Sequence, residues 1–173
     1  MAPYLKTKRL TLRPIRPDDA KNMTYLLHPE IQKDAGPYMP HSMDDLPRHM
    51  ERIAGDTSWL ITVGQDIVIG DIGVFSKIGN ETGELAYYLD PEYWGMGYAT
   101  EAGFAVIDYM INTLNFASLT APIVSTNTAS RKLVEKLGFA LERVEKDSDV
   151  HGFKADVCFY VLRRKGIEGR IIF

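Results

Sequence analysis

Cysteine is nearly absent from this chain, which also lacks long hydrophobic runs and a large excess of charge of one sign. Cys158 is the single cysteine among 173 residues, so no disulfide can form within the chain, and such usage is typical of a reducing compartment. No run approaches the roughly 18 apolar residues of a membrane-spanning helix, and the N-terminal MAPYLKTKRLTLRP has no apolar signal-peptide core. A formal net charge of -3 argues against a broad basic surface. We therefore expect a soluble cytoplasmic protein without a nucleic-acid or membrane partner.

Several well-known catalytic and phosphate-binding motifs are missing as well. No glycine loop ends in Gly-Lys-Ser/Thr, which excludes a Walker-type nucleotide site. Thr100 stands where a dinucleotide fingerprint has its third Gly or Ala, and the following LTAPIVST lacks the acid that such a site needs. There is no Gly-x-Ser-x-Gly elbow of a serine hydrolase. The four histidines have no spacing typical of a metal site, so we expect no metal.

What remains is the composition of one ordinary globular domain. Apolar residues make up 45% of the chain and charged residues 25%, as in folded soluble proteins. No repeat, low-complexity tract or linker divides the chain. We predict a single domain over residues 1–173.

Hydrophobic periodicity predicts a mixed α/β sheet. The alternation in LKTKRLTLRPI predicts a first strand, and Pro17-Asp18-Asp19-Ala20 predicts the start of a helix. β-branched runs separated by short turns within 58–90 predict antiparallel hairpins. The other expected elements are a short helix at 43–54, a helix at 98–114, a strand at 117–126, a helix at 127–138 and a closing hairpin at 139–164. This order differs from a strictly alternating βαβ array.

The stretch WGMGYATEA, residues 94–102, joins a predicted strand to a predicted helix. Gly95 and Gly97 let the backbone turn sharply, so that several amide N–H groups point the same way. The helix N-terminus adds unpaired donors and a partial positive charge. Such a loop can hold a pyrophosphate without a lysine. The same glycines also suit a plain strand-to-helix turn, and the loop alone does not decide between the two.

A second polar motif, Asn127-Thr128-Ala129-Ser130, opens the next helix at the end of the following strand. Asn127 suits the N-cap position, and a surface serine would complete an ordinary helix start. Capping needs only Asn127, however. The Asn-x-x-Ser spacing places Ser130 about one turn further on, at the same mouth of the sheet.

Together, WGMGYATEA and the later NTASRKLVEKLGF resemble the GCN5-related N-acetyltransferase (GNAT) superfamily, and in particular its branch of ribosomal-protein N-terminal acetyltransferases. RLTLRPIRPDDA and GELAYYLDPEYWG resemble the same branch, so the likeness covers nearly the whole chain. The resemblance implies an α/β (α+β) fold, with a mostly antiparallel sheet of about seven strands flanked by about four helices. It also implies transfer of an acetyl group from acetyl-CoA to a primary amine. The implied acetyl-CoA-binding residues are Leu89 beside the pantetheine, Gly95, Met96, Gly97, Tyr98, Ala99 and Thr100 around the pyrophosphate, and Asn127 with Ser130.

Two positions depart from the superfamily pattern. The loop usually begins with Gln or Arg three residues before the glycine matched by Gly97, and this chain has Trp94 there. The tyrosine that many members carry in the last helix, as proton donor to the leaving thiolate, aligns with Val134. We therefore take Ser130, one turn earlier, as the candidate catalytic acid.

The candidate base is Glu84, which begins the strand that ends at Leu89. Strand alternation puts Glu84 on the face opposite Leu85, Tyr87 and Leu89. Its carboxylate would accept the proton of the attacking amine, directly or through water, while a backbone N–H near Leu89 would stabilise the oxyanion. A solvated strand-end glutamate is the competing interpretation of Glu84.

The acceptor stays open at this point. A protein N-terminal α-amine fits the resemblance, a polyamine, amino acid or drug amine is the alternative, and a non-catalytic acyl-CoA-binding module would fit the missing tyrosine. Tyr38 and Met39 either wall the acceptor site or cover the core. The choice between monomer and homodimer, and the role of the tail RRKGIEGRIIF, also stay open.

Overall fold

The computed structural model describes residues 1–33, 39–150 and 153–164. The strands are β1 (Leu5–Lys6), β2 (Leu10–Pro14), β3 (Ser58–Val63), β4 (Ile67–Ile78), β5 (Thr82–Leu89), β6 (Ser118–Val124), β7 (Ala140–Val150) and β8 (Phe153–Arg163). The α-helices are α1 (Pro29–Gln32), α2 (Leu46–Ile53), α3 (Tyr98–Asp108) and α4 (Thr128–Lys136). Shorter turns are the 3-10 segments η1 (Asp19–Asn22), η2 (Thr24–Leu27), η3 (Met43–Asp45) and η4 (Pro91–Tyr93), and the π segment η5 (Tyr109–Thr113).

Within the described residues the strands form one sheet in the order β1-β2-β3-β4-β5-β6-β8-β7. Neighbouring strands are antiparallel, except that β5 and β6 run parallel. The mixed, mostly antiparallel sheet is therefore confirmed. The predicted first strand is divided in two, because the Thr7 hydroxyl accepts the Leu10 amide at 2.9 Å and turns the chain back on itself.

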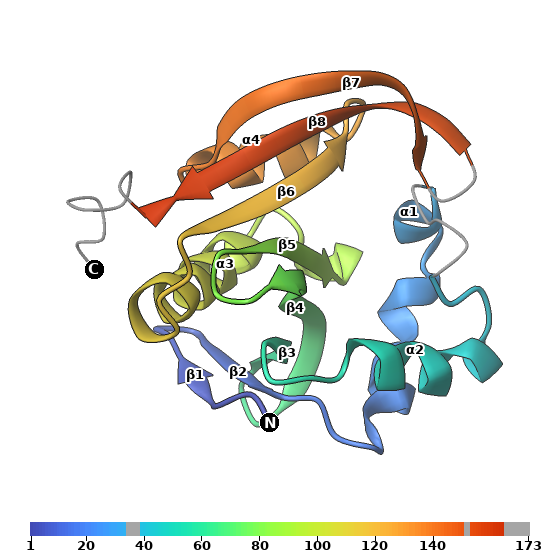
Figure 1. Cartoon of the computed structure of the whole chain (residues 1–173). Coiled ribbons are helices and arrows are strands. Elements are labelled where there is room, and N and C mark those ends of the chain that lie inside the picture. Colours follow the sequence, from blue (N-terminus) through green and yellow to red (C-terminus); the bar gives the residue numbers. More distant parts are fainter. Residues whose placement is uncertain (34–38, 151–152, 165–173) are drawn as a thin grey trace.

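The parallel pair β5 and β6 stays together for only part of its length. Pairing ends where Glu84 lies beside Thr120, although β5 continues to Leu89 and β6 to Val124. Beyond this point β6 remains paired with β8 alone, and the part of the sheet formed by β6, β8 and β7 diverges from β5 (Figure 1). We call this divergence the fork; its closed end lies at Glu84 and its open end at Leu89.

The backbone of β5 presents polar groups to the fork. The Asp90 amide donates to the Ile69 carbonyl of the neighbouring chain segment at 2.8 Å. Because hydrogen-bonded residues alternate along an antiparallel pair, the amides and carbonyls of Tyr87 and Leu89 face away from β4. The fork is therefore lined on one side by backbone donors and acceptors.

Two hydrophobic clusters cover the two faces of the sheet. The larger cluster joins α3 and α4 to the face that carries Leu85, Tyr87 and Leu89, and it contains Trp59 and Cys158 as core residues. The smaller cluster packs α1 and α2 against the opposite face, where Tyr88 lies. The predicted alternation along β5 is therefore confirmed. No helix in the described ranges has the length and apolar character needed to cross a membrane.

The predicted helix after Pro17 is wrong in detail, because the chain forms two separate 3-10 turns there. The turns are interrupted at Met23, where ψ is 19°, and they end at His28, which is extended because it precedes Pro29. A segment this short has little intrinsic helix stability. The predicted helix at 98–114 is present as α3 and continues as the π segment η5.

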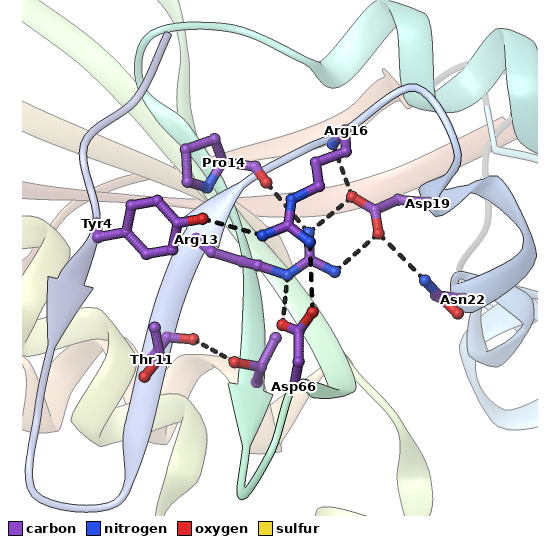
Figure 2. A network of polar contacts seen from close by, with 9 residues as sticks. Tyr4, Thr11, Arg13, Pro14, Arg16, Asp19, Asn22 and Asp66 are labelled. Atoms are coloured by element: carbon purple, nitrogen blue, oxygen red, sulfur yellow. Dashed lines mark hydrogen bonds and ion pairs between the residues drawn. The ribbon is translucent and has the colours of Figure 1, made fainter.

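A buried ion pair anchors these turns to the sheet (Figure 2). The Arg13 guanidinium on β2 donates to both carboxylate oxygens of Asp19, at 2.7 and 2.8 Å, and its Nε donates to Asp66. Burial alone would raise the pKa of Asp19, but hydrogen bonds from Arg13, the Arg16 amide and Asn22 hold it below its usual value. The segment after β2 is thus fixed by charge as well as by apolar packing.

Candidate active site

The loop between β5 and α3 has the backbone shape of an anion site. Gly95 and Gly97 have φ values of 75° and 79°, a region that residues with a Cβ disfavour. The first hydrogen bond of α3 runs from the Glu101 amide to the Gly97 carbonyl at 3.0 Å, so the amides of residues 98–100 precede the first bond of the helix and have no partner within it. A Cβ placed on Gly95 would meet no atom within 4 Å, so the space beside the loop is open. We call residues 95–100 the cradle; its amides and the helix N-terminus fit a pyrophosphate.

Trp94, which stands in place of the usual Gln or Arg, folds back on the end of β5. Its indole N–H donates to the Leu89 carbonyl at 2.7 Å. The Leu89 side chain is buried in the core below α3. Because the carbonyl is bonded to Trp94 and the side chain is buried, the amide is the part of Leu89 that can serve a pantetheine arm or an oxyanion.

The second predicted motif lies at the N-terminus of α4. The Asn127 side-chain oxygen accepts the Ser130 amide at 3.0 Å, which is an ordinary N-cap. Ser130 is half-buried, and its hydroxyl lies 2.6 Å from the hydroxyl of Tyr87 on β5. Burial raises the pKa of Tyr87 to about 12, although its hydrogen bond with Ser130 acts in the opposite direction.

Tyr87 is therefore a candidate site residue that the sequence did not point to as a functional group. The sequence feature that could have identified Tyr87 is its place on the same strand face as Leu85 and Leu89, which is the face that α4 covers. Val134, at the position of the usual tyrosine, is fully buried in that core. The hydroxyls of Tyr87 and Ser130 supply the polar groups on this side of the fork.

The parallel arrangement of β5 and β6 brings the two predicted motifs together. Both strands end at the same edge of the sheet, so the cradle after β5 and Asn127 after β6 lie at the open end of the fork. An extended ligand whose anion sits in the cradle would run along β5 between the two strands. Neither stretch of sequence alone predicts that the two motifs lie at the same end of the fork.

Glu84 lies at the other end, where the fork closes. It lines a hollow of about 240 Å³ together with Thr120, Pro122, Glu142, Arg143, Phe159, Tyr160 and Val161. Leu89 is five positions after Glu84, or roughly 17 Å along the strand. The structure thus places the two candidate catalytic residues on opposite faces of the sheet, with Ser130 on the α4 side.

A buried carboxyl that the sequence reasoning did not single out lies on the same sheet face as Glu84. Asp71 on β4 pairs in register with Tyr88 and is 5% exposed. Its Oδ1 accepts a hydrogen bond of 2.7 Å from the Tyr25 hydroxyl. Burial raises the pKa of Asp71 to about 7, against the lowering effect of that hydrogen bond.

Some expectations concern residues whose position is not described. Tyr38 and the end of the tail, residues 165–173, lie outside the described residues. Met39 is described, and it packs at the edge of the smaller hydrophobic cluster. For this residue, covering the core is the interpretation that the structure favours.

A family model described as an acetyltransferase (GNAT) domain matches residues 9–140. The chain belongs to the GNAT acetyltransferase family. An uncharacterized N-acetyltransferase, p20, from Bacillus licheniformis is 33% identical over 180 residues, which cover 95% of this chain and 98% of that protein. The predicted superfamily and its type of enzyme are confirmed.

Solved structures agree on the fold. A GNAT-family acetyltransferase from Bacillus anthracis has a TM-score of 0.85 at 22% identity, covering 94% of this chain and 99% of that one. The ribosomal α-N-protein acetyltransferase RimL in complex with coenzyme A has a TM-score of 0.80 at 16% identity, covering 93% and 98%. Membership of the GNAT family makes this chain an acetyl-CoA-dependent N-acetyltransferase, and the solved structures show the same fold.

Proposed function

We propose that this GNAT enzyme acetylates the N-terminal α-amine of a protein or peptide, with acetyl-CoA held in the cradle and along the fork. The observation that carries the proposal is the fork, because it joins an anion-binding loop to a strand with outward-facing backbone groups. The pyrophosphate would bind the amides of residues 95–100, and the pantetheine would pair with β5 through groups such as the Leu89 amide. Asn127 and Ser130 would contact the arm from the α4 side.

The reaction requires three contributions from the chain, namely stabilisation of the oxyanion, a proton for the thiolate and a base for the amine. The neutral amine attacks the thioester carbonyl carbon, a C–N bond forms, and a backbone N–H of β5 stabilises the oxyanion. The C–S bond then breaks, and the thiolate takes a proton from the Ser130 hydroxyl, which takes one in turn from Tyr87 through their hydrogen bond, and solvent returns a proton to Tyr87. Glu84, which lies at the closed end of the fork, takes through water the proton that the amine loses. The products are an amide and free coenzyme A thiol.

The lower pKa of an α-amine favours it as the acceptor over a lysine-like amine. An α-amino group has a pKa near 8, about two units below that of a lysine amine. It therefore needs less help from a base, which suits a site whose candidate base, Glu84, lies at the closed end of the fork. The fold likeness to RimL, a ribosomal α-N-protein acetyltransferase by its title, supports the same acceptor class.

A small cationic amine is the second candidate acceptor. The hollow at the closed end has two carboxylates, Glu84 and Glu142, and the aromatic ring of Phe159. A carboxylate and an aromatic face both attract an ammonium group. The charge there is partly balanced, because Glu142 forms ion pairs with Arg163 and Arg143. The Arg143 guanidinium also lies 3.9 Å from the centroid of the Phe159 ring, so a ligand ammonium would have to share that ring with it.

The test is release of coenzyme A thiol from acetyl-CoA with a panel of amines. The panel contains peptides with Ser, Ala or Met at the N-terminus, polyamines, single amino acids and aminoglycosides, and calorimetry measures acetyl-CoA binding in parallel. We expect release with the peptides and a kcat/KM that rises with pH up to about 8, the pKa of an α-amine. Release with polyamines alone would establish the second candidate. Acetyl-CoA binding without thiol release from any amine would contradict both and leave a non-catalytic binding module.

Variants identify the acid and the base. We expect Ser130→Ala to slow thiol release without weakening coenzyme A binding to the same extent. Thr128→Ala is the matched control, because it removes an exposed hydroxyl from the same turn of α4, where the Thr128 hydroxyl donates to the Thr126 carbonyl at 3.3 Å. Glu84→Gln should lower the rate mainly below the pKa of the amine. If Asp71→Asn has that effect and Glu84→Gln does not, Glu84 is not the base.

A further inference from the structure

The Arg9 side chain, from the turn between β1 and β2, reaches the cradle across a long stretch of sequence. Its Nη1 donates to the Met96 carbonyl at 2.9 Å. The guanidinium carbon lies 4.4 Å from the centroid of the Tyr98 ring. The Nη2 lies 3.5 Å from the position that a Cβ on Gly97 would take. The sequence reasoning missed this residue, because nothing in its local pattern ties it to the loop.

The bond to Met96 determines where a cradle amide points. The peptide between Met96 and Gly97 is trans, since the described residues contain no cis peptide bonds. In a trans peptide the carbonyl and the following N–H point in opposite directions. By holding the carbonyl on one side of the loop, Arg9 directs the Gly97 N–H to the other side, where an anion would lie.

Arg9 also balances a negative charge next to the cradle. Glu101, in the first turn of α3, accepts the Arg9 Nε at 2.7 Å, the Arg9 amide at 2.8 Å and the Thr7 hydroxyl at 2.6 Å. Burial would raise the pKa of Glu101, but these hydrogen bonds hold it below its ordinary value. The group is a carboxylate at neutral pH. Without a cation beside it, this carboxylate would oppose a pyrophosphate one helical turn away.

We propose that Arg9 is a positioning residue of the pyrophosphate site, which orients the Gly97 amide and neutralises Glu101 where the loop itself, with Trp94 in place of Gln or Arg, carries no cation. This inference rests on the proposed binding of acetyl-CoA in the cradle. The competing interpretation is an exposed ion pair that merely ties the β1–β2 turn to α3, and such pairs contribute little. The two interpretations predict different effects of removing Arg9 on the affinity for ligands that carry a pyrophosphate.

The experiment measures calorimetric Kd values for coenzyme A, 3′-dephospho-coenzyme A and pantetheine, together with steady-state KM and kcat for acetyl-CoA. We expect Arg9→Ala to weaken coenzyme A and the dephospho form alike by about tenfold, since a charge-assisted contact is lost. Pantetheine, which has no phosphate, should bind as it does to the unaltered protein. The KM for acetyl-CoA should rise while kcat changes less than twofold.

Two further variants make the test specific. Lys8→Ala removes the same charge from the neighbouring position of the same turn, and we expect less than a twofold change in Kd. The double variant Arg9→Ala with Glu101→Gln should recover part of the lost affinity, because the opposing carboxylate is gone.

Three outcomes would overturn the inference. They are an unchanged Kd in Arg9→Ala, an equal loss for pantetheine, and a loss confined to coenzyme A with none for the dephospho form. Failure of the proposed acetyl-CoA binding is a separate result, since the unaltered protein would then bind none of the coenzyme A forms. A melting temperature for each variant identifies any affinity loss that comes from unfolding.

Discussion

The Tyr87 hydroxyl on β5 lies 2.6 Å from the Ser130 hydroxyl on α4, although the two residues are 43 positions apart in the sequence. The pair links the strand that borders the fork to the helix that closes over it. Because burial raises the pKa of Tyr87 to about 12, the phenol stays protonated at neutral pH and keeps a proton to donate. A serine hydroxyl held in this way is available to a thiolate in the fork.

Removing the Tyr87 hydroxyl should therefore reduce turnover. We expect Tyr87→Phe to lower kcat by roughly tenfold with little change in KM, because the proton donor loses its partner while the ring still packs. The double variant with Ser130→Ala should be no worse than Ser130→Ala alone, since the two hydroxyls act as a unit. Tyr109→Phe is the control, because Tyr109 lies in the same core and packs edge-on against Trp59. Multiplicative losses in the double variant would show that the hydroxyls act separately.

Bulk at the cradle should abolish binding of the acetyl donor. Gly97 has a φ of 79° and caps α3, so Gly97→Val both strains the backbone and fills the space beside the amides. We expect calorimetric affinity for coenzyme A to fall by more than about a hundredfold, which is roughly 3 kcal/mol.

The matched control for this change is Gly64→Val. Gly64 has a φ of 58° and no atom within 4 Å of its would-be Cβ, so it has the same backbone strain without a cradle. It should lower stability but leave coenzyme A affinity intact. Retained affinity in Gly97→Val would contradict the assignment of the loop.

The buried Asp71 should make stability fall as the pH rises. Burial raises its pKa to about 7 in the folded chain, against about 3.9 when unfolded, so the folded state holds the proton more tightly. Its contribution is fully present below about pH 4, is lost between pH 4 and 7, and is constant above that range. Asp71→Asn stays neutral and can still accept the Tyr25 hydroxyl.

Urea unfolding across this range gives the measurement. The free energy of unfolding of Asp71→Asn relative to the unaltered protein should rise from pH 4 to pH 7. Because each pH unit between the two pKa values is worth about 1.4 kcal/mol, the rise should be on the order of 4 kcal/mol at most. A difference that is flat over this range would mean that Asp71 is ionised in the folded protein.

Breaking the buried ion pair of Figure 2 should be costly. Arg13 and Asp19 have side-chain exposures of 3% and 2%, and Asp19→Ala leaves a buried guanidinium with only the half-exposed Asp66 as anionic partner. We expect a loss of about 3–5 kcal/mol in the free energy of unfolding. Arg16→Ala, which breaks an exposed ion pair with the same Asp66, should cost less than about 1 kcal/mol. Similar losses in the two variants would show that Asp19 is not the main anchor.

Much of the fold could be predicted from local pattern. β3, β4 and β5 lie within residues 58–90, where the sequence predicts hairpins, and α4 begins after Asn127 and ends before Gly138, as the cap residues indicate. These elements are fixed by alternation, turn residues and caps, which act over a few positions. One exception is the segment after Pro17, where the Arg13–Asp19 ion pair and Pro29 prevail over a short helical pattern.

The cradle glycines, the Asn-x-x-Ser motif and the family likeness were all present in the sequence itself, because they depend on residue types at fixed spacings. The contacts between distant functional residues could not be predicted from the sequence. The contacts of Ser130 with Tyr87, of Arg9 with Met96 and Glu101, and of Tyr25 with Asp71 each join distant segments. Only the tertiary structure decided them, since they depend on where β5 and β6 diverge and on which helix covers which face, and no short stretch of sequence determines either.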